Sequence, residues 1–160
     1  MNKKVILITG ASSGMGKESA KALIQQGHTV YTVARRIDQM QDLAALGGHP
    51  IQMDVTIESD IQQVVDTIIR KEGKIDVLWN NAGYGLYGAV EDVPMDEARK
   101  QFEVNLFGLA MLTQTVVPYM RKAKSGTIIN TSSMGGKIYT PMGAWYHASK
   151  HALEGWSDCL

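Results

Sequence analysis

The chain of 160 residues is poor in the features that mark secreted or membrane-spanning proteins. Its one cysteine, Cys159, cannot form a disulfide within the chain, which suits a reducing compartment. The apolar run that follows Lys3 and Lys4 ends too soon for a signal peptide or a membrane span. We therefore expect a soluble, cytoplasmic protein.

An excess of charge is also lacking, because 16 Lys and Arg residues balance 16 Asp and Glu residues. This balance argues against a general surface for nucleic acid or for an anionic membrane, and we expect neither as a partner. The chain contains no repeat, low-complexity tract or linker. Its length suits one domain with a substantial core, and we predict a single domain over residues 1–160.

Glycine, by contrast, is concentrated just after the first apolar run, Val5–Ile8, where Gly10, Gly14 and Gly16 precede a helical pattern. A buried strand that turns sharply into a helix leaves the first helical amides unpaired, and these attract phosphate. Glycines permit the unusual φ values of such a turn and let a pyrophosphate approach the backbone. The spacing is not that of an NTPase P-loop, since Glu18 stands where Ser or Thr is needed. A tight turn without a ligand remains the alternative.

Apolar runs of strand length alternate with helical patterns along the rest of the chain. The helical rhythm is clear over 57–72, with Gly73 as a stop, and again from Asp96 to about Met120. Alternating strands and helices predict a parallel sheet covered on both faces, which is an α/β doubly wound, Rossmann-type fold. The five predicted strands are Val5–Ile8, Val30–Ala34, Ile51–Met53, Ile75–Trp79 and Thr127–Asn130.

The last predicted helix, Tyr146–Leu160, carries Tyr146 and Lys150 four residues apart, on one face and one turn apart. A free tyrosine titrates at about pH 10, and lowering its pKa to about 7 requires about 4 kcal/mol. A lysine ammonium about 5 Å away supplies roughly 3 kcal/mol at an effective dielectric constant of about 20. The pair is therefore credible as a proton donor and acceptor. Taken alone, Tyr-x-x-x-Lys also arises by chance in many helices.

Five motifs occur in order along the chain: Thr9–Gly16, Asn80–Gly83, Asn105, Ser132-Ser133 and Tyr146–Lys150. Together they resemble the short-chain dehydrogenase/reductase family, in its compact single-domain branch, over essentially the whole chain. The resemblance implies an oxidoreductase that moves a hydride between a nicotinamide dinucleotide and a small-molecule alcohol or carbonyl. The local sequence is most similar to hydroxysteroid and retinol dehydrogenase relatives, which suggests a lipophilic carbonyl.

The resemblance implies four catalytic residues. Tyr146 is the expected acid and base, and Lys150 is expected to lower its pKa and to bond the nicotinamide ribose. Ser133 is expected to polarise the substrate oxygen, and Asn105 to hold a water that relays protons from the lysine. Alternatively, Ser132 and Ser133 are turn residues and Asn105 is a polar break in a helix, although a buried amide needs a partner.

The residues after the second predicted strand bear on the choice of cofactor. A site for NAD places an acid there, whereas this chain has Arg35 and Arg36 and no acid before Asp38. Two guanidiniums suit a 2′-phosphate, so NADP(H) is preferred over NAD(H), with Arg35 as the main contact. The resemblance gives Asp54 the adenine amino group, although Asp54–Thr56 also reads as a helix start. The predicted dinucleotide-binding residues are Gly10, Ser12, Ser13, Gly14, Met15, Gly16, Arg35, Arg36, Asp54, Val55, Asn81, Ala82, Gly83, Tyr146 and Lys150.

Two histidines, His147 and His151, have a spacing that can bind zinc, but no third ligand is nearby. We predict no metal and expect both to be surface or interface residues.

Members of the resembled family continue with two further strands and a substrate loop, so we expect the chain to end inside its last helix with the C-terminal strands missing. A nucleotide-binding fragment without turnover is therefore the alternative function. Relatives pair through two long helices, which makes a homo-oligomer an open question. The small-residue stripe of the last helix suits either a subunit interface or packing on the sheet.

Overall fold

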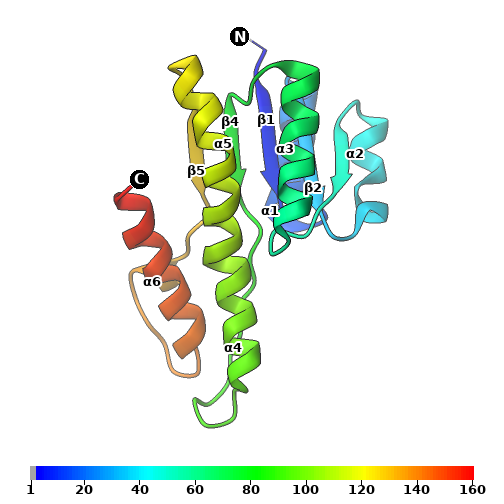
Figure 1. Ribbon diagram of the computed structural model, residues 1–160. Helices are drawn as coiled ribbons and strands as arrows, with labels where there is room; N and C mark the ends of the chain where they lie inside the picture. The colour runs from blue at the N-terminus through cyan, green and yellow to red at the C-terminus, as the bar shows by residue number, and fades with distance from the viewer. Residues whose placement is uncertain (1–2) are drawn as a thin grey trace.

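The computed structural model describes residues 3–160 and forms a parallel five-stranded sheet with helices on both faces (Figure 1). The strands are β1 (Val5–Thr9), β2 (Thr29–Ala34), β3 (His49–Gln52), β4 (Val77–Asn80) and β5 (Thr127–Asn130). The helices are α1 (Gly14–Gln25), α2 (Gln41–Ala45), α3 (Glu58–Glu72), α4 (Met95–Phe102), α5 (Leu109–Ala123) and α6 (Ala144–Asp158). The strand order is β3-β2-β1-β4-β5, so the predicted doubly wound α/β fold is confirmed.

The central strand β1 is buried on both faces, and its alternate side chains enter two separate cores. Leu7 packs with β2, α3 and α5 on the face seen at the front of Figure 1. Ile8 packs with α1 and α2 on the opposite face. A strand buried on both sides reads as a continuous apolar run, which is why the run was visible in the sequence.

The structure differs from the prediction mainly at the ends of elements. The third strand begins at His49 rather than Ile51, and the fourth is Val77–Asn80 rather than Ile75–Trp79. The segment 37–45, for which no helix was predicted, forms a 3₁₀ turn followed by α2, with Met40 and Leu43 in the second core. This segment is too short to show a helical period.

The long helix predicted from Asp96 is present, but it is not uniform. Between α4 and α5 the residues Glu103–Gly108 are π-helical, so the chain holds one wider turn in mid-helix. At the end of this turn the helix approaches the loop after β3 so closely that a Cβ atom at Gly108 would overlap the backbone oxygen of Val55. This contact brings the helix against the carboxyl ends of the strands.

The helix predicted from Tyr146 to Leu160 spans Ala144–Asp158, and two residues follow it. It is joined to β5 by a bond from Asn130 Nδ2 to Ser157 Oγ of 2.9 Å. Within residues 3–160, no helix is both long and apolar enough to cross a membrane.

Two helical glycines offer a matched test of this packing. We expect Gly108→Ala to lower the free energy of unfolding by about 1–3 kcal/mol, because the new methyl meets a backbone oxygen that cannot turn away. Gly155→Ala in α6, where no atom lies within 4 Å of the new Cβ, is expected to raise it by up to about 1 kcal/mol. Urea unfolding measures both. Equal effects of the two variants would contradict the close approach at Gly108.

Candidate active site

The turn between β1 and α1 depends on the small size of its glycines. Gly10 has φ +67°, and a Cβ there would lie 2.8 Å from the Cα of Ala82. A Cβ at Gly16 would lie 2.5 Å from Asn81 Nδ2 and 2.9 Å from the Gly10 oxygen. Ser13, the residue before the helix, makes no side-chain capping bond, and the first turn carries no acid. The amides at the start of α1 can therefore receive an anion.

Side chains hold this turn against the end of β4. The Thr9 hydroxyl accepts bonds of 2.9 Å from the backbone amides of both Asn81 and Ala82. Asn81 Nδ2 in turn donates to the Thr9 carbonyl at 3.1 Å. The sequence analysis did not single out Thr9, although a hydroxyl at the last position of an apolar strand is a signal that could have identified it.

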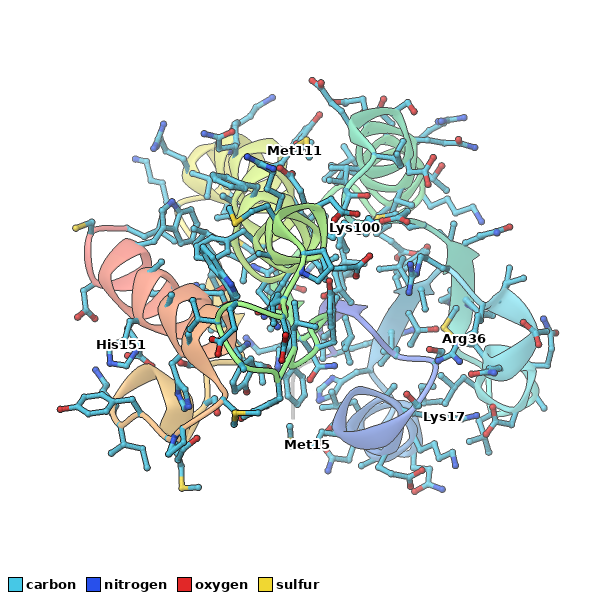
Figure 2. The ribbon with its side chains drawn as sticks, turned by 90° about the horizontal axis from the view of Figure 1, so that it is seen from below. Met15, Lys17, Arg36, Lys100, Met111 and His151 are labelled. Atoms are coloured by element: carbon cyan, nitrogen blue, oxygen red, sulfur yellow. The ribbon has the colours of Figure 1, made fainter. Side chains whose placement is uncertain are left out.

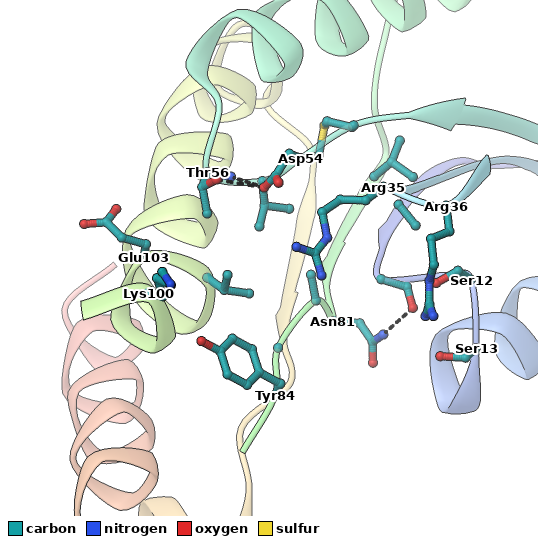
Figure 3. A pocket seen from close by; sticks show the side chains of 18 of the residues that line it. Ser12, Ser13, Arg35, Arg36, Asp54, Thr56, Asn81, Tyr84, Lys100 and Glu103 are labelled. Atoms are coloured by element: carbon teal, nitrogen blue, oxygen red, sulfur yellow. Dashed lines mark hydrogen bonds between the residues drawn. The ribbon is translucent and has the colours of Figure 1, made fainter. Parts of the chain in front are cut away.

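A cavity of about 870 Å³ opens in front of this turn, at the carboxyl ends of the strands (Figure 3). Arg35 and Arg36 follow β2 and point into it, with the Arg36 guanidinium beside Ser12 and Ser13. Both arginines are exposed, and neither forms an ion pair within residues 3–160. Of the predicted dinucleotide-binding residues, those that line the cavity are Gly10, Ser12, Ser13, Met15, Arg35, Arg36, Asp54, Val55, Asn81, Ala82 and Gly83.

The 3₁₀ turn behind the arginines is attached to α1 by Lys17. Its Nζ donates to the Gln39 carbonyl at 2.6 Å and pairs with Asp42 at 2.9 Å. The bond from Lys17 lowers the pKa of Asp42, so this carboxylate stays ionised. Seen from the carboxyl ends of the strands, Lys17 and Arg36 project from adjacent elements on the same side of the molecule (Figure 2).

Asp54 lines the cavity but is also a turn residue. Its Oδ1 accepts bonds from the amide and the hydroxyl of Thr56, at 3.0 and 2.8 Å (Figure 3). Helix α3 begins at Glu58 with Ile57 as its N-cap and without a side-chain capping bond, so Asp54 forms a turn ahead of the helix and does not cap it. Asp54 also lies in the cavity wall, and its contact with adenine stays a prediction.

The opposite wall of the cavity comes from the loop after β4 and from α4, and the sequence analysis did not identify it. Tyr84 projects toward Lys100 and Glu103 in Figure 3. Burial, together with the charge of Glu97, raises the pKa of Tyr84, so this phenol stays protonated. Helical spacing from 97 to 104 could have indicated one shared face, but only the fold shows that it meets the strand ends. The residues concerned are Tyr84, Glu97, Lys100, Glu103 and Val104.

Asn105 lies in the π-helical turn with 1% of its surface exposed. Its Oδ1 accepts the Tyr84 amide at 3.0 Å, and its Nδ2 donates to the Tyr84 carbonyl at 2.9 Å and to Ser149 Oγ at 3.0 Å. Gln101 Nε2 donates to the same carbonyl at 3.1 Å. These bonds satisfy the buried amide and hold the loop after β4 at the cavity.

Lys150 is 6% exposed, and its Nζ donates to the Thr131 carbonyl at 2.8 Å. Burial lowers the pKa of this lysine, because the charged form loses solvation. A Cβ at Gly83 would lie 3.6 Å from Lys150 Nζ and 3.0 Å from Asn105 Oδ1. Gly83 lines the cavity, so the lysine and the asparagine lie directly behind its wall.

Tyr146 is half-buried, and glycines from two loops flank its ring. A Cβ at Gly85 would lie 3.6 Å from the ring and one at Gly135 would lie 3.1 Å from it. Gly135 is bonded to Ser133, whose Oγ accepts the Gly135 amide at 3.0 Å. Asn105, Tyr146 and Lys150 thus contact the loops after β4 and β5, and Ser133 belongs to the second of these loops. Of the four, Asn105 and Lys150 lie behind the cavity wall at Gly83.

Other predicted residues lie differently. Gly14 and Gly16 shape the turn without lining the cavity, Lys150 lies behind its wall at Gly83, and Tyr146 is not part of the lining. The expectation that His147 is a surface or interface residue is wrong, since its ring is buried and bonds Gly135 and Thr140. Within residues 3–160, no three His, Cys, Asp or Glu side chains gather in a way that could hold a metal.

Proteins of known sequence and structure match the chain along its length. The model of the short chain dehydrogenase family matches residues 4–160. The chain is 43% identical over 160 residues to the 3-ketodihydrosphingosine reductase of Bacteroides thetaiotaomicron, covering 100% of this chain and 58% of that protein. A solved short-chain dehydrogenase from Streptomyces avermitilis superposes with a TM-score of 0.95 at 40% identity, covering 98% of this chain and 59% of that one.

A metagenomic short-chain oxidoreductase, solved in complex with NADP, superposes with a TM-score of 0.87 at 33% identity, covering 96% of this chain and 72% of that one. The chain spans less than two thirds of the length of the Bacteroides and Streptomyces proteins. The match of the family model from Lys4 onward, together with these identities, identifies the protein: the chain belongs to the short-chain dehydrogenase family.

Proposed function

We propose that the chain is an oxidoreductase that interconverts an alcohol and a carbonyl with NADP(H) as cofactor. One observation carries the proposal: a buried lysine lies behind the wall of a cavity of about 870 Å³ that opens at an uncapped helix N-terminus, and a tyrosine stands one turn before it on the same helix. Binding of a nucleotide alone needs no such pair. When bound, the nicotinamide supplies or accepts the hydride.

The residues of the cavity fit a dinucleotide phosphate. Gly10 and Gly16 leave the space that a Cβ would fill, and the first amides of α1 and the positive end of its dipole suit the pyrophosphate. Arg35 and Arg36, neither of them ion-paired within the described chain, suit the additional 2′-phosphate of NADP(H). Asp54 and Val55 then border the adenine. These features support a preference for NADP(H) over NAD(H).

The proton is handled by Tyr146, whose hydroxyl donates to the carbonyl oxygen in reduction and accepts from the alcohol in oxidation. The role proposed for Lys150, one turn further along α6, is to supply a positive charge that assists this proton transfer. Ser133 Oγ already accepts the Gly135 amide, so its own proton is available to polarise the substrate oxygen. We assign Asn105 to the path by which a proton returns to the lysine, since both adjoin Gly83.

The substrate side of Tyr146 is apolar, which favours a lipophilic carbonyl. Tyr87 lies 5.6 Å from the Tyr146 ring, and the loop after β5, whose Gly135 flanks the same ring, exposes large apolar side chains. The Bacteroides relative is named as a reductase of 3-ketodihydrosphingosine, a lipid ketone. The exposed apolar side chains of the loop are Met134, Ile138, Tyr139 and Met142.

A second function, nucleotide binding without turnover, is favoured by one observation: the chain spans 58% of the Bacteroides relative. Titration of NADPH and NADH against the fluorescence of Trp79, Trp145 and Trp156 needs no knowledge of the substrate. NADPH oxidation with a panel of aliphatic and aromatic ketones then separates the two functions. Binding with turnover supports the oxidoreductase, and binding without turnover supports the second function.

Replacing the proposed acid tests the mechanism. We expect Tyr146→Phe to reduce turnover at least about 100-fold, because proton transfer is lost, while the Kd for NADPH stays nearly unchanged. Tyr87→Phe is the matched control, because the Tyr87 ring lies beside Tyr146. Removing the Tyr87 hydroxyl is expected to leave the rate largely intact. A Tyr146→Phe enzyme with most of its activity would remove this hydroxyl from the mechanism.

Charge at the cavity wall sets the cofactor preference. We expect Arg35→Asp to lower the ratio of NADPH to NADH affinity by roughly 10- to 100-fold, because a bidentate contact to phosphate is replaced by repulsion. Arg70→Asp on α3, outside the cavity lining, makes the same change in net charge. Fluorescence titration of both cofactors measures the ratio, and an unchanged ratio in Arg35→Asp would count against the phosphate contact.

Replacing Lys150 tests whether this residue serves catalysis or stability. We expect Lys150→Met to abolish turnover and to change the free energy of unfolding by no more than about 1 kcal/mol. Removing a buried charge offsets the loss of its bond to the Thr131 carbonyl. Chemical denaturation and NADPH oxidation measure the two effects. A loss of stability of about 3 kcal/mol or more would make Lys150 a structural residue instead.

A further inference from the structure

His147, the residue after Tyr146, has a buried imidazole that the proposed mechanism does not use. The ring fits between two glycines. A Cβ at Gly135 would lie 2.8 Å from its Nδ1, and one at Gly143 would lie 2.6 Å from its Nε2. The loop after β5 is therefore folded around this one side chain at both of its ends.

The hydrogen bonds of the ring determine where its proton lies. The backbone amide of Thr140 donates to Nε2 at 3.1 Å, and the Gly135 carbonyl lies 3.0 Å from Nδ1. An amide can only donate and a carbonyl can only accept, so Nδ1 carries the proton and Nε2 does not. A doubly protonated ring would direct an N–H group at the N–H group of Thr140. The Thr140 hydroxyl, 3.0 Å from Nε2, can donate to the same nitrogen, so the arrangement suits a ring with its proton on Nδ1.

The groups that His147 holds are those that border Tyr146. Gly135 donates to Ser133 Oγ and lies against the Tyr146 ring. Beyond Thr140 the loop reaches Met142, which has φ +68°, a sparsely populated backbone conformation for a side chain of this kind. The Met142 carbonyl accepts the Gly88 amide at 2.8 Å, which joins the loop to the one after β4.

We propose that His147 is a positioning residue: as the neutral Nδ1–H tautomer it latches the 133–143 loop onto α6 and so sets Ser133 and the apolar loop side chains relative to Tyr146. A second proton, on Nε2, ends the bond from the Thr140 amide and leaves the Thr140 hydroxyl as the only partner at that nitrogen. The consequence for substrate binding rests on the proposed function, whereas the latch itself does not.

Few charges around the ring compete with this assignment. The aromatic rings beside it are the phenols of Tyr146, at 5.8 Å, and Tyr87, at 6.4 Å. The one charged residue of the loop after β5, Lys137, pairs with Glu154 of α6 at 2.9 Å. On α6, Lys150 turns to the Thr131 carbonyl and His151 Nδ1 lies 2.9 Å from the backbone oxygen of His147. The loop after β4 contributes Glu91 and Asp92, both exposed.

Nuclear magnetic resonance of the ¹⁵N-labelled chain tests the latch without any substrate. We expect the His147 ring to give the shifts of an Nδ1–H tautomer at about pH 8. When the pH is lowered from about 8 to about 5, the Thr140 amide is expected to lose protection from hydrogen exchange roughly tenfold beyond the intrinsic change. An Nε2–H tautomer, or protection of Thr140 that does not depend on pH, overturns the proposal.

Two conservative variants separate the two ring nitrogens. His147→Gln places an amide oxygen near the position of Nε2 and does not titrate, so we expect protection of Thr140 at both pH values. His147→Asn keeps a donor near Nδ1 but does not reach Thr140, so protection is lost at both. His151→Gln, on the exposed next turn of α6 (Figure 2), is the control and is expected to behave as the wild type.

The chemical shifts of the Ser133 and Gly135 amides test the positioning role. We expect these shifts to change in His147→Asn and to stay unchanged in His147→Gln. With a ketone substrate, His147→Asn is expected to raise KM several-fold with little change in kcat. Unmoved Ser133 and Gly135 shifts in His147→Asn overturn the positioning role. If the proposed function is wrong but the latch exists, the result is different: the wild-type chain shows the latch by nuclear magnetic resonance and turns over no ketone.

Discussion

The arrangement of the site depends on hydrogen bonds that join the carboxyl ends of β1, β4 and β5. Thr9 receives the amides of Asn81 and Ala82, and Thr131 donates to Asn81 Oδ1 at 3.4 Å. The Thr131 carbonyl then receives Lys150 from α6. Backbone groups beyond the ends of parallel strands have no ladder partner, so side chains must satisfy them. Here those side chains also set the distance between the glycine turn and the tyrosine-bearing helix.

Some cationic side chains of the site form ion pairs, and others do not. Lys100, which lines the cavity, pairs with Glu97, and Lys17, on α1, pairs with Asp42. Arg35 and Arg36 line the same cavity without an ion pair to any described residue. An exposed guanidinium without a carboxylate partner costs little in water, and it keeps its full capacity for a phosphate. The lysines are engaged in ion pairs within the protein, whereas the unpaired arginines are available to bind a ligand.

How far the sequence predicts this molecule depends on the range of the interaction involved. Val5–Ile8 and the helix that ends at Gly73 were predictable because their patterns are local, and Gly73 does adopt a left-handed conformation. The strand order and the bond from Asn105 to Tyr84 depend on pairing between distant segments, which no local pattern encodes. The π-helical turn ends at Gly108, where the helix meets Val55, and this close approach is also a tertiary contact.

The same distinction applies to the candidate site. The residue types at Gly10, Asn105, Tyr146 and Lys150 were recognisable because five motifs occur in a fixed order. His147 was misjudged because the partners of a histidine are visible only in the fold, and here they are a carbonyl and an amide of a neighbouring loop. Tyr84 and Lys100 were missed for the same reason, since apposition of α4 and the strand ends brings them to the cavity.

The geometry of α6 explains why one helix can serve two tasks. Residues four apart lie on one face, so Tyr146 and Lys150 both face the loops at the strand ends. The next residue along is rotated by about 100°, which turns His147 toward the loop after β5 instead. The pair proposed to transfer the proton and the histidine proposed to hold the loop after β5 therefore share one turn of α6. Gly135 of that loop lies against both the Tyr146 ring and the His147 ring. The position of the loop and the surroundings of the Tyr146 phenol are therefore coupled by direct contact.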